Sequence, residues 1–295
     1  MEELKLRRSM LFVPGISLKM ITKGIGLPAD SVILDLEDAV EFAKKSEART
    51  VVQQALQEVD FGEKEIVLRI NSLESEFAEE DLKSCLKIQV DTILLPKVNQ
   101  PEDIEKLDRL ISKISLEKGL GPDQIKIMAM METPAGVLNS AKIARASRRM
   151  SGFMLGAADL TKDTRAKITE SRIELLFAMS QILYSARIAG IDAIDSPYFN
   201  IKNEKGLEEH TLQAMRLGYD GKAVIHPGQI EIVNRVFSPT PEEIERAKRI
   251  ISAFEIAQKE GKGVTTVDGE LIEHLHVTQA RRLLNIVPRT KVQVS

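Results

Sequence analysis

Short apolar runs recur along the chain, separated by longer stretches in which apolar residues return with a helical period. Apolar runs of this length suit strands that are buried on both faces, as in parallel sheets. The expected strands are residues 9–14, 31–36, 65–70, 92–97, 125–131, 152–157, 191–195 and 222–226.

The stretches between these runs have helix start and stop signals. Residues 101–119 begin with a proline and two acids, close on Gly119 and place four isoleucines and leucines on one stripe. Residues 172–190 behave in the same way and end at Gly190. Eight strands that alternate with helices predict an α/β fold of the (β/α)8 TIM barrel type, with a doubly wound open sheet as the alternative.

The last part of the chain breaks this alternation. Residues 241–261 read as a helix with Thr240 as its cap and Pro241 as its first residue, and a hairpin around Asp268-Gly269 follows. We therefore expect a barrel domain over 1–238 and an extension of helix, hairpin and helix over 239–295.

Composition narrows the class of protein. The chain of 295 residues is 43% hydrophobic and 29% charged, with a formal net charge of −3. These values predict a soluble globular protein without nucleic acid as its main partner. The single cysteine, Cys85, excludes an internal disulfide and is interpreted as a buried thiol. No signal core or membrane-length apolar run is found, so we expect a cytoplasmic protein.

Nearly every expected strand delivers an ionisable group to its C-terminal end, where the chemistry of such barrels is located. Glu132 and Asp159 follow consecutive strands, which lie about 4.8 Å apart. Two carboxylates without a nearby histidine or cysteine suit Mg²⁺, which fills its other positions with water and substrate oxygens. The alternative is that Glu132 pairs with Arg69 or Lys97.

Basic residues near the same ends are candidates for anion binding. Arg69 follows a strand and can hold a substrate carboxylate at two points, or form an internal salt bridge to Glu37 or Asp38. Both can hold at once, because a neighbouring acid such as Glu37 would orient the arginine. Lys19 and Lys23 lie one helical turn apart and form either a basic face near the site or a solvated helix surface.

Several motifs in order resemble the citrate lyase β subunit and its relatives, the CitE-like branch of the HpcH/HpaI aldolase superfamily. The resemblance covers nearly the whole chain through RRSMLFVPG, SVILDLEDAV, VLRIN, ILLPKV, METPAGV, LGAADLT, GYDGKAVIHPGQI and VDGELIEHLHV.

The resemblance implies a Mg²⁺-dependent barrel enzyme that cleaves or forms a C–C bond in a 3-hydroxyacyl thioester. The thiol would be CoA or an acyl carrier protein, the acyl group citryl, malyl or citramalyl, and the second product a 2-oxo acid. It implies a homo-oligomer, such as a trimer or hexamer, or a subunit of a citrate lyase complex.

The resemblance also implies roles for individual residues. Glu132 and Asp159 match metal ligands, and Arg69 matches the arginine that holds the carboxylate of the oxo acid. The positions that match ligand-contacting segments, the first three of them near CoA, are Phe12, Lys19, Lys23, Ile225 and His226. From its residues alone, His226 is equally interpreted as a histidine satisfied by backbone hydrogen bonds.

The C-terminal segment departs from the family pattern, in which it forms a lid that reaches a neighbouring subunit. Glu273 stands where relatives have an aspartate, Leu275 replaces a proline, and Ala158 replaces an acid found in many relatives. Glutamate can also move protons, so Glu273 is the candidate for protonating the thioester enolate left by C–C cleavage. The alternatives are an aldolase acting on free 4-hydroxy-2-oxo acids, an enzyme that also hydrolyses the thioester, and a non-catalytic binding subunit.

Overall fold

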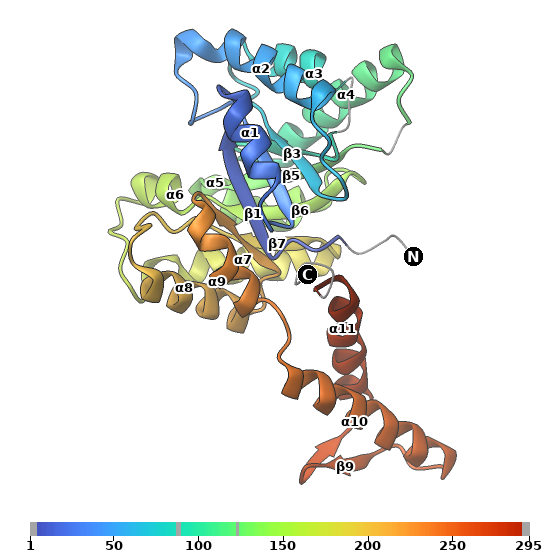
Figure 1. Ribbon diagram of the computed structural model, residues 1–295. Helices are drawn as coiled ribbons and strands as arrows, with labels where there is room; N and C mark the ends of the chain where they lie inside the picture. Colours follow the sequence, from blue (N-terminus) through green and yellow to red (C-terminus); the bar gives the residue numbers. More distant parts are fainter. Residues whose placement is uncertain (1–4, 87–89, 122–123, 291–295) are drawn as a thin grey trace. The chain divides into compact units, whose positions relative to one another are not determined.

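The computed structural model describes residues 5–86, 90–121 and 124–290. Within them, β1 to β8 form a closed parallel barrel in which each strand pairs with the next and β8 pairs with β1 (Figure 1). The strands are β1 Ser9–Pro14, β2 Ser31–Asp35, β3 Glu65–Arg69, β4 Thr92–Leu95, β5 Lys126–Met131, β6 Met150–Leu155, β7 Asp192–Asp195 and β8 Gly221–Val224. The predicted barrel is confirmed, and the open-sheet alternative is wrong.

Helices follow the strands and surround the barrel (Figure 1). They are α1 Leu18–Ile25, α2 Lys45–Glu58, α3 Ala78–Cys85, α4 Pro101–Lys118, α5 Pro134–Ile143, α6 Ala157–Thr164, α7 Leu176–Ala189, α8 Glu204–Leu217 and α9 Ile230–Val236, with 3₁₀ turns η1 Phe42–Lys44, η2 Ile173–Leu175 and η3 Pro227–Gln229. The predicted helix over 101–119 is α4. The one predicted over 172–190 begins as η2, because Arg172 has a left-handed backbone with φ 53°.

Side chains fill the barrel interior in layers, because every second residue of a strand points inward. The middle layer is apolar and consists of Met10, Ile33, Val67, Leu94, Met128, Met154, Ile194 and Ala223. Two residues earlier along the strands, Glu65 accepts hydrogen bonds from Ser31, Thr92 and Arg7. Two residues later, Asp35 and Arg69 are register partners. The same alternation that builds the core therefore sets polar side chains at the C-terminal end of the strands.

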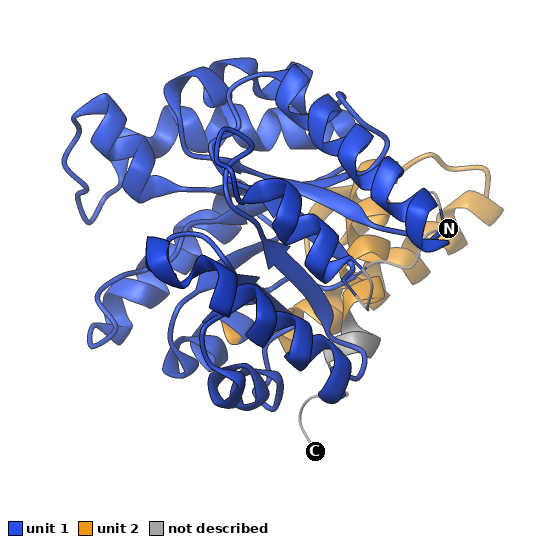
Figure 2. Cartoon of the chain, turned by 90° about the horizontal axis from the view of Figure 1, so that it is seen from above, with its two compact units in different colours: residues 1–234 blue, residues 235–295 orange. Residues whose placement is uncertain are grey.

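The chain divides into two compact units, Met1–Asn234 and Arg235–Ser295, coloured blue and orange in Figure 2. The second unit contains α10 Pro241–Lys259, the hairpin strands β9 Thr265–Val267 and β10 Glu270–Ile272, and α11 His274–Thr290. Asp268 and Gly269 both have positive φ, 52° and 82°, as a two-residue hairpin turn requires. Its own apolar core is Ala247, Ile250, Phe254, Val267, Ile272, Val277 and Ala280. The predicted helix and hairpin are confirmed.

Cys85 is fully buried at the end of α3, and burial raises the pKa of its thiol to about 12. The prediction of a buried thiol is confirmed. Among the described residues, none of the helices combines the length and apolar character that a membrane span needs.

Candidate active site

Arg69 lies at the end of β3 and is almost entirely enclosed by protein. Its Nε and Nη2 donate to the two oxygens of Asp35 at 2.7 and 2.5 Å, and its guanidinium carbon lies 4.9 Å from the ring centre of Phe12. Burial alone would lower the pKa of Arg69, but Asp35, Glu37 and Asp38 together raise it above its ordinary value. The site therefore holds a permanently charged guanidinium in one orientation.

The turn after β2 brings two more carboxylates to Arg69. Glu37 Oε2 lies 2.9 Å and Asp38 Oδ2 3.5 Å from Nη1 of Arg69. Glu37 Oε2 is buried without a properly aligned hydrogen bond. Burial raises the pKa of Glu37 to about 7, although the charge of Arg69 opposes this shift. The predicted alternative of an internal salt bridge to Arg69 is confirmed, with Glu37 beside the arginine as expected.

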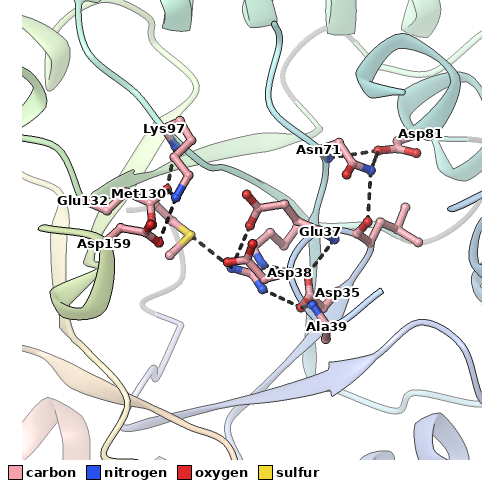
Figure 3. Close-up of polar contacts among 12 residues, drawn as sticks. Asp35, Glu37, Asp38, Ala39, Asn71, Asp81, Lys97, Met130, Glu132 and Asp159 are labelled. Atoms are coloured by element: carbon pink, nitrogen blue, oxygen red, sulfur yellow. Dashed lines mark hydrogen bonds and ion pairs between the residues drawn. The ribbon is translucent and has the colours of Figure 1, made fainter. Parts of the chain in front are cut away.

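Buried hydrogen bonds from outside the barrel fix this turn. Lys45 Nζ donates to the carbonyl oxygens of Leu36 and Glu37 at 2.8 and 2.7 Å. Asn71 Nδ2 donates to the Leu36 carbonyl at 3.0 Å and to Asp81 at 2.7 Å, as the close-up in Figure 3 shows. The backbone that presents Glu37 and its neighbours is thus held independently of any ligand.

Glu132 directly follows β5 and is 1% exposed. Thr133 caps α5 by accepting a hydrogen bond from the Gly136 N–H, and Pro134 is the first helical residue. A Cβ on Gly136 would collide with the Val98 carbonyl, so only glycine fits there. The sequence Glu-Thr-Pro-Ala-Gly therefore starts a helix immediately behind a buried carboxylate. Burial raises the pKa of Glu132, although the charge of Lys97 counteracts it.

Asp159 faces Glu132 from the first turn of α6, not from the end of β6 as the sequence suggested. β6 ends at Leu155, and α6 begins at Ala157. Acidic side chains are favoured in the first turn of a helix by its dipole. The pKa of Asp159 is lowered despite its partial burial, because Lys97 and then Lys162 stabilise the charged form.

Lys97 joins the two carboxylates. Its Nζ lies 2.8 Å from Asp159 Oδ2 and 3.5 Å from Glu132 Oε1, and its backbone N–H donates to the same Glu132 oxygen at 2.7 Å (Figure 3). The predicted alternative of a Glu132–Lys97 pair is what the structure contains. The two carboxylates thus converge on one cation, here an ammonium group.

This donor set fits a magnesium ion. Both carboxylates reach a common position, and within the part of the chain that the structure describes no three His, Cys, Asp or Glu side chains gather into an all-protein metal cage. Mg²⁺ is usually held by one or two carboxylates and keeps several positions for water and substrate.

A cavity of about 380 Å³ lies between the Arg69 group and the Glu132 group. Its walls combine charged and apolar residues from four strands of the barrel and from the segments that follow the C-terminal ends of strands. The lining residues are Phe12, Pro14, Asp35, Asp38, Ala39, Arg69, Met130, Glu132, Gly156, Ala157, Ala158, Asp159, Pro197, Phe199 and Ile225. A charged end and a largely apolar wall suit a small acid joined to a longer organic group.

The remaining predicted site residues lie in different places. Phe12 and Ile225 line the cavity. His226 is exposed, and its Nδ1 accepts a hydrogen bond from the Gly228 N–H, in agreement with the interpretation as a backbone-satisfied histidine. Lys19 and Lys23 are exposed on α1. Glu273 belongs to the second unit, between β10 and α11, and its carboxylate is exposed.

The expectation that strand ends deliver ionisable groups to the site is wrong for Asp195, the last residue of the expected strand 191–195. Asp195 is adjacent to the inward-facing Ile194 and therefore points out of the barrel wall, where it pairs with Arg172 and, at 2.5 Å, with Lys222 Nζ. Burial would raise the pKa of Asp195, but these two cations lower it to about 2. Asp195 thus stabilises the fold and does not reach the cavity.

The sequence did not reveal two features of the site. Asp35 was expected among the acids at the C-terminal end of its strand, but not as the principal partner of Arg69. Gly156 is required because a Cβ there would collide with the Cβ of Glu132 and lie 2.6 Å from its Oε2. The signal for Gly156 was a glycine at the end of an apolar strand, which marks close approach of another group.

Comparisons with known proteins show what the whole chain is similar to. The citrate lyase subunit beta of Leuconostoc mesenteroides subsp. cremoris is 40% identical over 282 residues, covering 96% of this chain and 93% of that protein. A (3S)-malyl-CoA thioesterase of Cereibacter sphaeroides is 39% identical over 277 residues, covering 94% and 93%. The structure of CitE from Mycobacterium tuberculosis with magnesium, acetoacetate and coenzyme A has a TM-score of 0.75 at 26% identity, covering 94% of this chain and 96% of that one.

A family model described as HpcH/HpaI aldolase/citrate lyase matches residues 8–227, which span the barrel from the start of β1 to the loop after β8. The matched region contains Arg69, Glu132 and Asp159, the charged groups around which the cavity is built. The chain belongs to the HpcH/HpaI aldolase/citrate lyase family.

Proposed function

We propose that this protein is a Mg²⁺-dependent carbon–carbon lyase. It would cleave a 3-hydroxyacyl-CoA thioester into acetyl-CoA and a 2-oxo acid, or form the thioester from these two compounds. The observation that carries the proposal is the convergence of Glu132 and Asp159 on one cation position, across the cavity from Arg69. Family membership and the relatives named citrate lyase subunit beta support it.

Glu132 and Asp159 would hold the metal. Their oxygens lie within 3.5 Å of a single nitrogen, so both side chains already have the required direction. A bound Mg²⁺ supplies a Lewis acid that stabilises negative charge developing on substrate oxygens. Gly156 leaves the space that the Glu132 carboxylate occupies.

Arg69 would bind the carboxylate of the oxo-acid part of the substrate. Asp35 fixes its Nε and Nη2, so Nη1 remains as the donor that faces Glu37 and Asp38. A substrate carboxylate would compete with these two acids for Nη1, whereas the pair with Asp35 would persist. Phe12 packs on the guanidinium and limits its movement.

The thioester part would extend along the apolar wall that includes Pro197, Phe199 and Ile225. Lys19 and Lys23 are exposed on α1, which follows β1 at the same end of the barrel, and would attract the phosphates of CoA. Replacing both by alanine should raise KM for a CoA thioester and leave KM for a free 4-hydroxy-2-oxo acid unchanged. An equal effect on both substrates would favour the free-acid aldolase.

Glu273 is proposed as the proton-transfer residue, supplied by the 239–295 extension to the active site of a neighbouring copy in a homo-oligomer or a citrate lyase complex. Its carboxylate is exposed and makes no ion pair with the described residues. In its acid form, the Glu273 side chain would donate its proton to the enolate carbon and become the carboxylate.

The test is a panel of 3-hydroxyacyl-CoA thioesters, such as malyl-, citramalyl- and citryl-CoA, with product detection by mass spectrometry. Glu132→Gln and Asp159→Asn should each lower turnover at least about a hundredfold, because each removes one of two metal ligands. Asp163→Asn, an exposed acid on the same helix, is the matched control. Full turnover by Glu132→Gln in excess EDTA would refute the proposal.

Thioester hydrolysis is a second candidate, supported by relatives named (3S)-malyl-CoA thioesterase. The same assay separates it from simple cleavage. Free CoA with the intact hydroxy acid indicates direct hydrolysis, and free CoA with acetate and the oxo acid indicates cleavage followed by hydrolysis. Accumulation of acetyl-CoA with the oxo acid indicates a lyase alone.

A further inference from the structure

Lys97 has a backbone conformation that is unusual for its type. It is the second residue after β4 and has φ 55°, in the left-handed region that residues other than glycine rarely adopt. Such residues persist where the surrounding structure requires them, and they cluster at functional sites. The observation calls for a reason why a lysine stands at this position.

Contacts of Lys97 with the two site carboxylates supply that reason. The backbone N–H donates to Glu132 Oε1 at 2.7 Å, and Nζ lies 2.8 Å from Asp159 Oδ2 and 3.5 Å from Glu132 Oε1. One residue therefore fixes the buried Glu132 through its backbone and closes the gap to Asp159 through its side chain.

The ammonium occupies the position on which both carboxylates converge, and a divalent cation held by the same oxygens needs that position. Two cations cannot share it, because they would repel one another at contact distance. The Lys97 side chain is 32% exposed and ends a flexible stem of four carbons, so the ammonium can leave without moving the backbone.

We propose that Lys97 is the resident counter-ion of the metal-free site, and that its ammonium must be displaced before Mg²⁺ binds, so that Lys97 sets the metal affinity of the protein. The inference rests on the proposed function only in its use of Glu132 and Asp159 as metal ligands. The ammonium keeps the two carboxylates together when no metal is bound. It also lowers the apparent metal affinity, because the fraction of molecules with Lys97 engaged is not ready to bind.

A positively charged neighbour provides the matched control. Lys162 lies on α6 one turn after Asp159, and its Nζ is 3.5 Å from Asp159 Oδ1, the oxygen that Lys97 does not contact. Its side chain is 76% exposed. Solvent screens such a pair. Loss of Lys162 should therefore change metal affinity little, although it removes the same charge from the same carboxylate.

The experiment is calorimetric titration of the purified full chain with MgCl₂, together with thermal unfolding with and without the metal. Lys97→Met should bind Mg²⁺ roughly tenfold more tightly than the wild type, as expected when an engaged competitor is removed. Its melting temperature without metal should fall, and the rise on adding Mg²⁺ should exceed that of the wild type. Lys162→Met should stay within about twofold of the wild type in affinity.

A second variant guards against misfolding. Lys97→Gly also removes the ammonium, and glycine accepts the positive φ and keeps the N–H that holds Glu132. Unchanged or weaker Mg²⁺ binding by both Lys97→Met and Lys97→Gly would overturn the role proposed for Lys97. The proposed function would not be affected by that result. The proposed function would be overturned as well if the wild-type protein bound no Mg²⁺ and Glu132→Gln left the turnover of CoA thioesters unchanged.

Discussion

Asp35 and Arg69 are register partners on neighbouring strands, and their side chains meet in a two-point ion pair inside the mouth of the barrel. Both groups are buried, at 1% and 7% exposure. Asp35 also accepts backbone N–H groups of Glu37 and Ala39 at 2.9 and 3.1 Å. One carboxylate therefore orients the cavity-lining arginine and also closes the turn that carries the other acids.

Asp35→Asn should be costly, because it leaves a buried guanidinium without its main counter-charge. We expect a loss of about 3 kcal/mol in the free energy of unfolding, and a lower kcat/KM as Arg69 loses its fixed orientation. Chemical denaturation and steady-state kinetics measure the two effects. Asp38→Asn is the control, since Asp38 lies 3.5 Å from Arg69 with a side chain that is 61% exposed. Equal destabilisation by both variants would contradict the assigned role of Asp35.

Gly156→Ala should damage the proposed metal site without replacing a charged residue. The added methyl group would collide with the Cβ of Glu132 and push against its Oε2, so the carboxylate must turn away from Asp159. We expect Mg²⁺ affinity to fall at least about tenfold, as expected when a rigid ligand is misplaced. Gly26→Ala serves as the control, because the nearest atom to its Cβ lies 3.6 Å away and its φ is −70°. Unaltered Mg²⁺ binding by Gly156→Ala would show that Glu132 is not a ligand.

The strand pattern predicted the barrel because parallel strands are buried on both faces and appear as short, nearly continuous apolar runs. The same burial hides which side chain points inward. Asp195 ends β7 as Arg69 ends β3. Arg69 nevertheless points into the cavity, whereas Asp195 points outward from the barrel and pairs with Lys222. Only the barrel register, which no single run contains, separates them.

The charged residues of the site were predictable as a set, and two of their pairs, Arg69 with Glu37 and Glu132 with Lys97, were predicted only as alternatives. Glu132 and Asp159 were grouped because they follow consecutive strands, and the short α6 that carries Asp159 did not alter the grouping. The partnership of Arg69 with Asp35 and the position of Lys97 between two acids depend on tertiary distances. Propensity and spacing carry no information about such contacts.

Acid stability should depend on the opposite end of the barrel. Glu65 is 2% exposed and paired with Arg7 at 2.6 Å; burial alone would raise its pKa, but Arg7 and the Thr92 and Ser31 hydroxyls lower it to about 2. Because the pKa is lower in the folded state, the stabilisation is fully present above pH 4.5 and is lost as pH falls toward 2. Its size is on the order of 3 kcal/mol.

Glu65→Gln removes this titration, so the variant should be less stable at neutral pH and lose less stability than the wild type between pH 4.5 and 2. Urea denaturation at a series of pH values measures the difference. Lys5 and Asp91 form an exposed pair at 2.7 Å, so Asp91→Asn should alter the acid profile far less. Parallel profiles for wild type and Glu65→Gln would refute the prediction.

The role proposed for Glu273 leads to a complementation experiment. If Glu273 acts on the active site of a neighbouring copy, Glu132→Gln and Glu273→Gln inactivate different halves of a composite site. Each variant alone should be inactive. Co-expression of the two should restore activity up to about a quarter of the wild-type value, the share of sites that random assembly completes.

The control is co-expression of Glu132→Gln with Asp159→Asn, two changes that fall within the same barrel and cannot be repaired by mixing. Glu270→Gln, an exposed acid in β10 that pairs with Arg246, tests whether any charge loss in the extension has the same effect. Activity of Glu273→Gln at the wild-type level would remove the residue from the mechanism. Inactive variants that never complement would place Glu273 at the active site of its own chain, because a site built within one chain cannot be completed by another.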